Sequence, residues 1–229
     1  MKKLLLCLCL FTATRVSAQM RITYTSSTLF MNEYDEKGFL VTSKAREVKG
    51  AQWLNENWGT GYVKFLNDKL FPNVKLRFNL FTNELRYQLD STEFAFVEPV
   101  KEFSFSYNEA GKEYFVLYKN GYPGNMQDSK QIFYEVISEG KRFHLLKRNR
   151  LIIHEGYTHT AAMALYYKQL EEWYVFDKQS GSLMQIKNIQ SLSESFPEMG
   201  DVIAKVTGKK SGKFKSEKEL VDVISQSNQ

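Results

Sequence analysis

Cysteine is scarce in this chain, whose 229 residues include only Cys7 and Cys9. Both lie in an opening segment that we expect to be removed on export. The mature chain would then have no disulfide framework, no thiolate nucleophile and no cysteine-ligated metal site. Its stability must come from a hydrophobic core, which a chain of roughly 200 residues is long enough to bury.

The opening segment, residues 1–18, has the three parts of an export signal. These are a charged start, a short apolar core and small residues before the cleavage point, provided by Lys2 and Lys3, residues 4–11, and Val16, Ser17 and Ala18. We therefore expect cleavage before Gln19 and a protein that works in the periplasm or outside the cell. No later stretch reaches about eighteen apolar residues, so we expect no transmembrane segment after the leader is removed.

The expected mature chain also has little excess of charge of one sign. The leader contains three basic residues and no acid, so its removal lowers the formal net charge from +5 to about +2. A nearly balanced chain has no long-range field for nucleic acid or anionic lipid, and we expect no nucleic-acid partner. Two local basic runs remain, residues 147–150 and 205–215. We interpret them as solvated turns and a linker, with a phosphate or polyanion site as the alternative.

Aromatic residues are abundant, with 17 Phe, 13 Tyr and 3 Trp. They occur in short runs that alternate apolar and polar residues, which is typical of strands with one face on a core. Hairpins are predicted around Asn83, around residues 139–140 and around residues 179–181, and further strands over 92–97, 100–107 and 113–118. Residues 160–170 fit a helix or a strand equally well.

The pattern changes at about residue 188. Apolar residues recur at three- and four-residue spacing over 192–206, which predicts one or two short helices. Ser216 and Glu219 have the form of a capping box at the start of another helix. We therefore predict a mainly β (α+β) fold. Residues 19–187 would form an antiparallel β-sandwich or open barrel of roughly eight strands, and residues 188–229 a helical C-terminal region.

The order of several segments resembles a family of small exported proteins of Bacteroidetes for which no activity is assigned. The segments that carry the resemblance are Leu76-Arg77-Phe78-Asn79, Val100-Lys101-Glu102-Phe103, Phe133-Tyr134-Glu135-Val136, Leu145-Leu146-Lys147 and Phe214-Lys215-Ser216-Glu217. The resemblance covers roughly residues 60–228. It implies a β-rich body with a helical tail in a cell-envelope setting, and it supplies no catalytic residue.

All three histidines, His144, His154 and His159, lie close together in the sequence, which raises the question of a metal site. The segment His154 to His159 is superficially similar to a zinc-protease helix. Such helices place two imidazoles four residues apart on one face, whereas the spacing here is five and Gly156 intervenes. An ordinary polar loop is therefore the favoured interpretation, with a weak metal site at His154 and His159 as the alternative.

Motifs of catalysis are missing as well. The chain has no G-x-S-x-G elbow, no marked pair of carboxylates and no phosphate-binding glycine loop. We expect no catalytic residue and no cofactor. The alternative class is a hydrolase or metal-dependent enzyme that uses the region from His144 to His159.

Four aromatic residues in or beside expected loops are candidate ligand-binding residues: Trp53, Trp58, Tyr62 and Tyr122. Flat rings on a β scaffold can stack on sugars or fill a partner's pocket, although packing in the core is the alternative for each. Arg77 is expected to pair with Asn79 on the outward face of the first hairpin, near Glu84 across the turn. The sequence thus predicts an exported, non-enzymatic envelope or secreted protein that binds a protein partner or a surface glycan. It leaves the oligomeric state open.

Overall fold

The computed structural model describes residues 33–34, 40–41, 47–123, 132–157 and 163–229. The chain divides into two units, residues 1–47 and 48–229. In the first unit, β1 (Glu33–Tyr34) pairs with β2 (Leu40–Val41) in antiparallel fashion. The expected leader lies outside the described residues.

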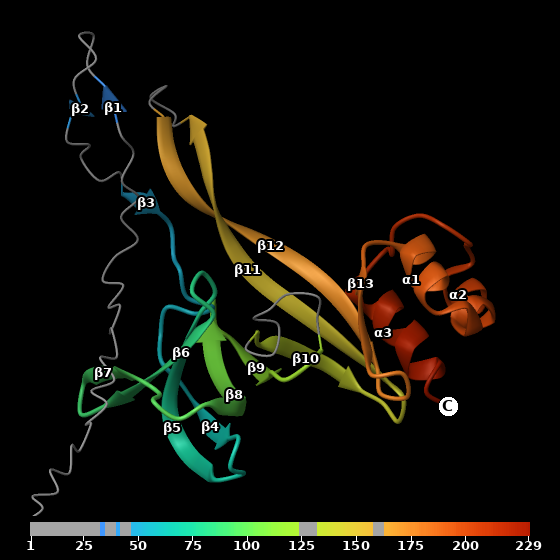
Figure 1. Ribbon diagram of the computed structural model, residues 1–229, viewed down its shortest axis with the longest axis horizontal. Coiled ribbons are helices and arrows are strands. Elements are labelled where there is room, and N and C mark those ends of the chain that lie inside the picture. The colour runs from blue at the N-terminus through green and yellow to red at the C-terminus, as the bar shows by residue number, and fades with distance from the viewer. Residues whose placement is uncertain (1–32, 35–39, 42–46, 124–131, 158–162) are drawn as a thin grey trace, which may run out of the picture. The chain divides into compact units, whose positions relative to one another are not determined.

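The described part of the second unit is built on one sheet of eleven strands, which confirms the mainly β prediction (Figure 1). The strands are β3 (Val48–Lys49), β4 (Gly59–Phe65), β5 (Leu70–Asn79), β6 (Glu84–Leu89), β7 (Thr92–Ala95), β8 (Val100–Glu109), β9 (Lys112–Lys119), β10 (Tyr134–Glu139), β11 (Phe143–Tyr157), β12 (Met163–Asp177) and β13 (Ser182–Ile186). Their order is β13-β12-β11-β10-β9-β8-β4-β5-β6-β7. All pairs are antiparallel except that of β3, which runs parallel to β12.

The three predicted hairpins are confirmed as β5–β6, β10–β11 and β12–β13. Asn83 has a φ of 57° in the first turn, the left-handed conformation that asparagine tolerates. The ambiguous region belongs to strand β12 from Met163 onward. Residues 147–150 were expected in solvated turns, and this was wrong. They lie in β11, where paired carboxylates on β10 and β12 allow a basic run to form a strand.

Strand β4 was not predicted, because Gly59, Thr60 and Gly61 have the composition of a loop. The glycines are required by the close approach of β8. A Cβ at Gly61 would overlap the carbonyl of Ser104, and one at Gly59 would overlap Phe105 and the carbonyl of Ser106. Glycine here marks the close packing of two backbones within the sheet.

The larger core is aromatic and lies inside the curl of the sheet. Its buried rings include Phe78, Phe103, Phe105 and Tyr118, and the rings of Phe103 and Tyr118 stack with centroids 5.0 Å apart. The curl brings the end of β5 to β11, where the Leu151 amide donates to the carbonyl of Leu80 at 3.3 Å. Distant strands of one sheet therefore share this core.

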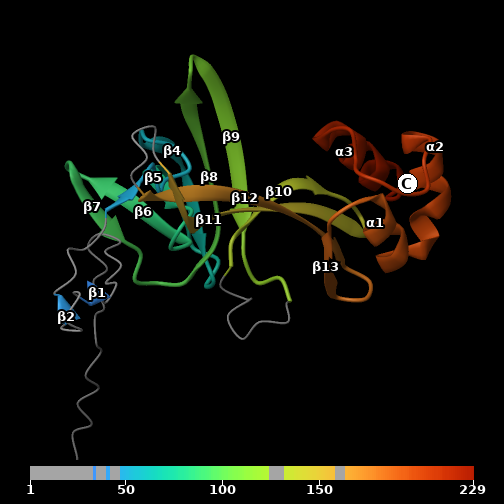
Figure 2. The same ribbon diagram turned by 90° about the horizontal axis from the view of Figure 1, so that it is seen from above.

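A second core lies between the strands β10 to β13 and the C-terminal helices. These are α1 (Ile189–Ser195), the 3-10 helix η2 (Pro197–Met199), α2 (Gly200–Thr207) and α3 (Glu217–Gln226). Figure 2 shows them grouped at the β13 end of the β11–β12 hairpin. Ser216 caps α3 as predicted, but Glu219 accepts a hydrogen bond from the Lys215 amide rather than from that of Ser216. None of the helices in the described residues is long and apolar enough to cross a membrane.

Candidate functional site

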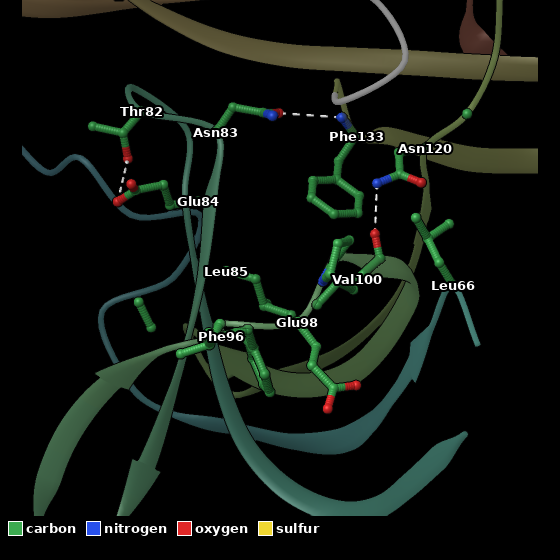
Figure 3. A pocket seen from close by; sticks show the side chains of 14 residues that line it. Leu66, Thr82, Asn83, Glu84, Leu85, Phe96, Glu98, Val100, Asn120 and Phe133 are labelled. Atoms are coloured by element: carbon green, nitrogen blue, oxygen red, sulfur yellow. Dashed lines mark hydrogen bonds between the residues drawn. The ribbon is translucent and has the colours of Figure 1, made fainter. Parts of the chain in front are cut away.

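The strongest candidate site is an open pocket of about 750 Å³ in the first half of the sheet. Five separate segments line it: the ends of β4 and β9, the β5–β6 turn with the start of β6, the linker from β7 to β8, and the residue before β10 (Figure 3). The lining residues are Leu66, Thr82, Asn83, Glu84, Leu85, Ala95, Phe96, Val97, Glu98, Pro99, Val100, Asn120, Gly121 and Phe133. Its volume is within the range of sites that bind ligands of small-molecule size.

The floor of the pocket is apolar and belongs to the larger core. Leu85, Val100 and Phe133 are each less than 10% exposed and pack within the aromatic cluster. At the mouth, Val97 is 95% exposed and Leu66 is 59% exposed. The pocket thus has a buried apolar floor and exposed apolar residues at its mouth. Entry of an apolar group, which displaces water from these surfaces, is favourable.

Side-chain amides hold the frame of this pocket. Asn120 donates to the carbonyl of Val100 at 2.6 Å, and Asn83 accepts a hydrogen bond from the Phe133 amide at 3.2 Å. Leu66 is fixed through its backbone, which donates to the carbonyl of Pro99 at 3.1 Å. The connecting segments are therefore tied to one another, and the pocket is formed before any ligand arrives.

The rim carries negative charge. Two carboxylates, Glu84 and Glu98, are among the lining residues, and no basic side chain of the described residues lines the pocket. Glu84 pairs with Arg86 at 2.7 Å, whereas Glu98 accepts a hydrogen bond from the neutral amide of Asn67 at 3.1 Å. The pocket is thus apolar inside and acidic at its edge.

Trp53 and Trp58, two of the residues singled out from the sequence, both lie against Arg77. The guanidinium carbon is 3.8 Å from the ring centroid of Trp53 and 4.8 Å from that of Trp58. Arg77 also pairs with Glu93 at 2.7 Å. The expected pairing of Arg77 with Asn79, near Glu84, was therefore wrong, because two rings and the carboxylate of Glu93 on β7 surround the guanidinium instead.

The two candidate tyrosines lie elsewhere. Tyr62 donates to Glu102 at 2.7 Å, within a polar row that continues across the strands through Lys119 to Glu139. Burial raises the pKa of the Tyr62 phenol, and its hydrogen bond to Glu102 raises it further. Tyr122 is only 7% exposed, and burial likewise raises its pKa. Its ring packs edge-to-face on Tyr134 and Phe176. The four aromatic candidates therefore do not form one site.

The histidine region is a strand rather than the expected polar loop. His144 is buried at one end of β11, where burial lowers its pKa. His154 is exposed, opposite Tyr166 on β12, and lies ten residues or about 33 Å further along the strand. His159 lies outside the described residues. Within the residues that the structure describes, no group of three or more His, Cys, Asp or Glu side chains could hold a metal ion.

Sequence reasoning missed the pocket because its lining comes from five segments that are far apart in the chain. One local signal was present, namely the run from Ala95 to Val100, in which apolar residues flank Glu98 and Pro99. An apolar run interrupted by proline is atypical of a core strand. Comparisons with protein-family models, curated proteins and solved structures give no match, so similarity assigns neither the fold nor the pocket.

Proposed function

We propose that this chain is an exported, non-enzymatic binding protein of the cell envelope or exterior that recognises a protein partner. The observation that carries the proposal is the preformed apolar pocket with Val97 and Leu66 exposed at its mouth. The partner places one or more apolar side chains in the pocket, against Leu85, Val100 and Phe133. The export signal expected in residues 1–18 supports the location.

A protein partner is favoured over a surface glycan by the environment of the aromatic rings. Sugars stack on free ring faces, and Trp53 and Trp58 already have the Arg77 guanidinium over their rings. The pocket itself has an apolar floor and polar groups only at its rim, which suits an aliphatic or aromatic side chain better than a hydroxylated ring. A glycan remains an outcome of the test below.

Catalysis through the region from His144 to His159 gains no support from the geometry. His144 is buried, and its neighbours are Glu139 at 3.7 Å and the rings of Tyr122 and Phe176. His154 is displaced along the same strand by the length of ten residues. These two side chains do not converge on a common substrate position.

The test is an array of extended peptides, run beside a glycan array, with the full chain as probe. Val97→Asp is the pocket variant, and Phe115→Asp on β9 is the matched control because Phe115 is 70% exposed and does not line the pocket. Burying one valine is worth about 1.5 kcal/mol, so Val97→Asp is expected to weaken peptide binding about tenfold or more. Phe115→Asp should bind like the original chain. Equal binding by both variants, or retention on glycans alone, would overturn the proposal.

A further inference from the structure

Strand β7 forms one edge of the sheet, directly beside the pocket. It pairs with β6 on one side and has no strand on its other side among the described residues. All four of its side chains are exposed. The chain then runs from Ala95, the last residue of β7, into the pocket lining at Phe96 and Val97.

The hairpin geometry shows which backbone groups face outward. Asp90 and Ser91 have φ angles of 47° and 66° and form a two-residue turn, which favours the type I′ hairpin. The residues that flank such a turn, Leu89 and Thr92, form a hydrogen-bonded pair, and the next hydrogen-bonded pair is Tyr87 and Phe94. The N–H and C=O groups of Glu93 and Ala95 therefore point away from β6, toward the open edge.

Apart from its shortness, at four residues, this edge lacks the features that usually protect an edge strand from pairing with another chain. Native edge strands are commonly blunted by free charges, prolines or bulges. The only charged side chain of β7, Glu93, is held by Arg77, and β7 contains no proline and pairs with β6 in unbroken register. Phe94 and Leu89 beside it are 39% and 58% exposed. The edge is therefore open to another strand.

We infer that an extended segment of the partner adds to β7 as a further strand and thereby directs one apolar side chain into the pocket. This inference rests on the proposed function and specifies the mode of recognition. Main-chain hydrogen bonds to Glu93 and Ala95 supply affinity, and the pocket supplies specificity. Glu84 is already paired with Arg86, but Glu98 at the rim accepts only from the neutral amide of Asn67, and its carboxylate selects a segment that carries lysine or arginine next to its apolar residues.

A second copy of this chain suits the edge less well. Pairing β7 with another β7 would bring two acidic rims together, each with a Glu98 that has no basic partner among the described residues. Like charges that approach across an interface oppose association. The occupant is therefore a basic, apolar segment of a different protein.

The experiment uses synthetic peptides that alternate valine and threonine, with one central phenylalanine and a lysine at each end. Two isomers carry backbone N-methyl groups on alternate residues, one on the odd positions and one on the even positions. Only one set of amides in an added strand faces β7, so methylation should weaken binding in one isomer about tenfold and leave the other close to the parent peptide. Binding to the full chain is measured by fluorescence anisotropy.

On the protein side, Ala95→Pro removes an outward-facing donor, and Ala95→Ser keeps it. We expect about tenfold weaker peptide binding for Ala95→Pro and little change for Ala95→Ser. Neither variant should alter the oligomeric state of the chain. Peptides that bind in a Val97-dependent way but are indifferent to methylation would overturn strand addition and leave the proposed function intact. The absence of any Val97-dependent binding would overturn both. Dimerisation lost in Ala95→Pro would assign the edge to a second copy and overturn the inferred partner.

Discussion

Asn228, the second-last residue, fastens helix α3 to the β10–β11 turn with both ends of its side-chain amide. Its Oδ1 accepts hydrogen bonds from the amides of Arg142 and Phe143 at 3.0 and 2.8 Å. Its Nδ2 donates to the carbonyls of Phe143 and Ile224 at 3.0 and 2.9 Å. Each such bond contributes about 0.5–1.5 kcal/mol, so Asn228→Ala should lower the free energy of unfolding by about 2–4 kcal/mol.

Gly140 provides a second way to break the same contact. A Cβ at this position would overlap the amide group of Asn228, so Gly140→Ala must displace that side chain. We expect Gly140→Ala to cost nearly as much as Asn228→Ala. Once Asn228 has been replaced by alanine, however, the added methyl group meets no amide and should cost little. The two substitutions should therefore be strongly non-additive, with a coupling of about 2 kcal/mol.

The assay is urea denaturation of the original chain, the two single variants and the double variant, followed by circular dichroism and tryptophan fluorescence. Asn228→Asp is a useful fifth chain, because it keeps the acceptor and loses the two donated bonds. Additive costs for Gly140→Ala and Asn228→Ala would refute the reasoning. A loss below about 0.5 kcal/mol in Asn228→Ala would refute it as well.

Three further predictions concern charged and titratable side chains. Arg77→Ala should lower stability by about 1–2 kcal/mol and change tryptophan fluorescence, because the guanidinium lies against two indole rings; Arg77→Lys should not restore both properties. Arg142 hydrogen-bonds to Asp177 through two nitrogens and lowers the pKa of that carboxyl to about 2. The stabilisation from this ion pair is full above about pH 4 and is lost as the pH falls toward 2. Asp177→Asn should therefore flatten the pH dependence of the urea midpoint over that range. Burial lowers the pKa of His144, and protonation therefore favours the unfolded chain. Stability should fall as the pH drops below about 6.5, less so in His144→Gln, and an NMR titration showing a pKa at or above 6.5 would contradict this.

The parts of the fold that sequence reasoning predicted depend on local physics. Alternating residues place one face of a strand on the core, and this identified the hairpin around Asn83, whose side chain tolerates the positive φ of the turn. Ser216 starts α3 because its hydroxyl accepts from the amide of Glu219. Such features involve residues within a few positions of each other and can be read from composition and spacing.

The parts that could not be predicted depend on long-range packing. The glycines of β4 look like a loop until β8 is placed against them. The alternation of apolar and polar residues in β5 predicts that Arg77 is exposed on the outward face. In the structure, Trp53, Trp58 and Glu93 surround it. The pocket requires the curl of the sheet to bring five segments together. The run from Ala95 to Val100 marks one of these segments, but no local pattern shows that the five lie together.

Hydrogen exchange of the full chain, with and without the alternating peptide, tests the central claim most directly. In the free protein the amides of Thr92 and Phe94 should exchange slowly because they bond to β6, whereas those of Glu93 and Ala95 should exchange fast. The account predicts that the peptide slows exchange at Glu93 and Ala95. Unchanged exchange at these positions, or protection centred on residues 53–58, would contradict it.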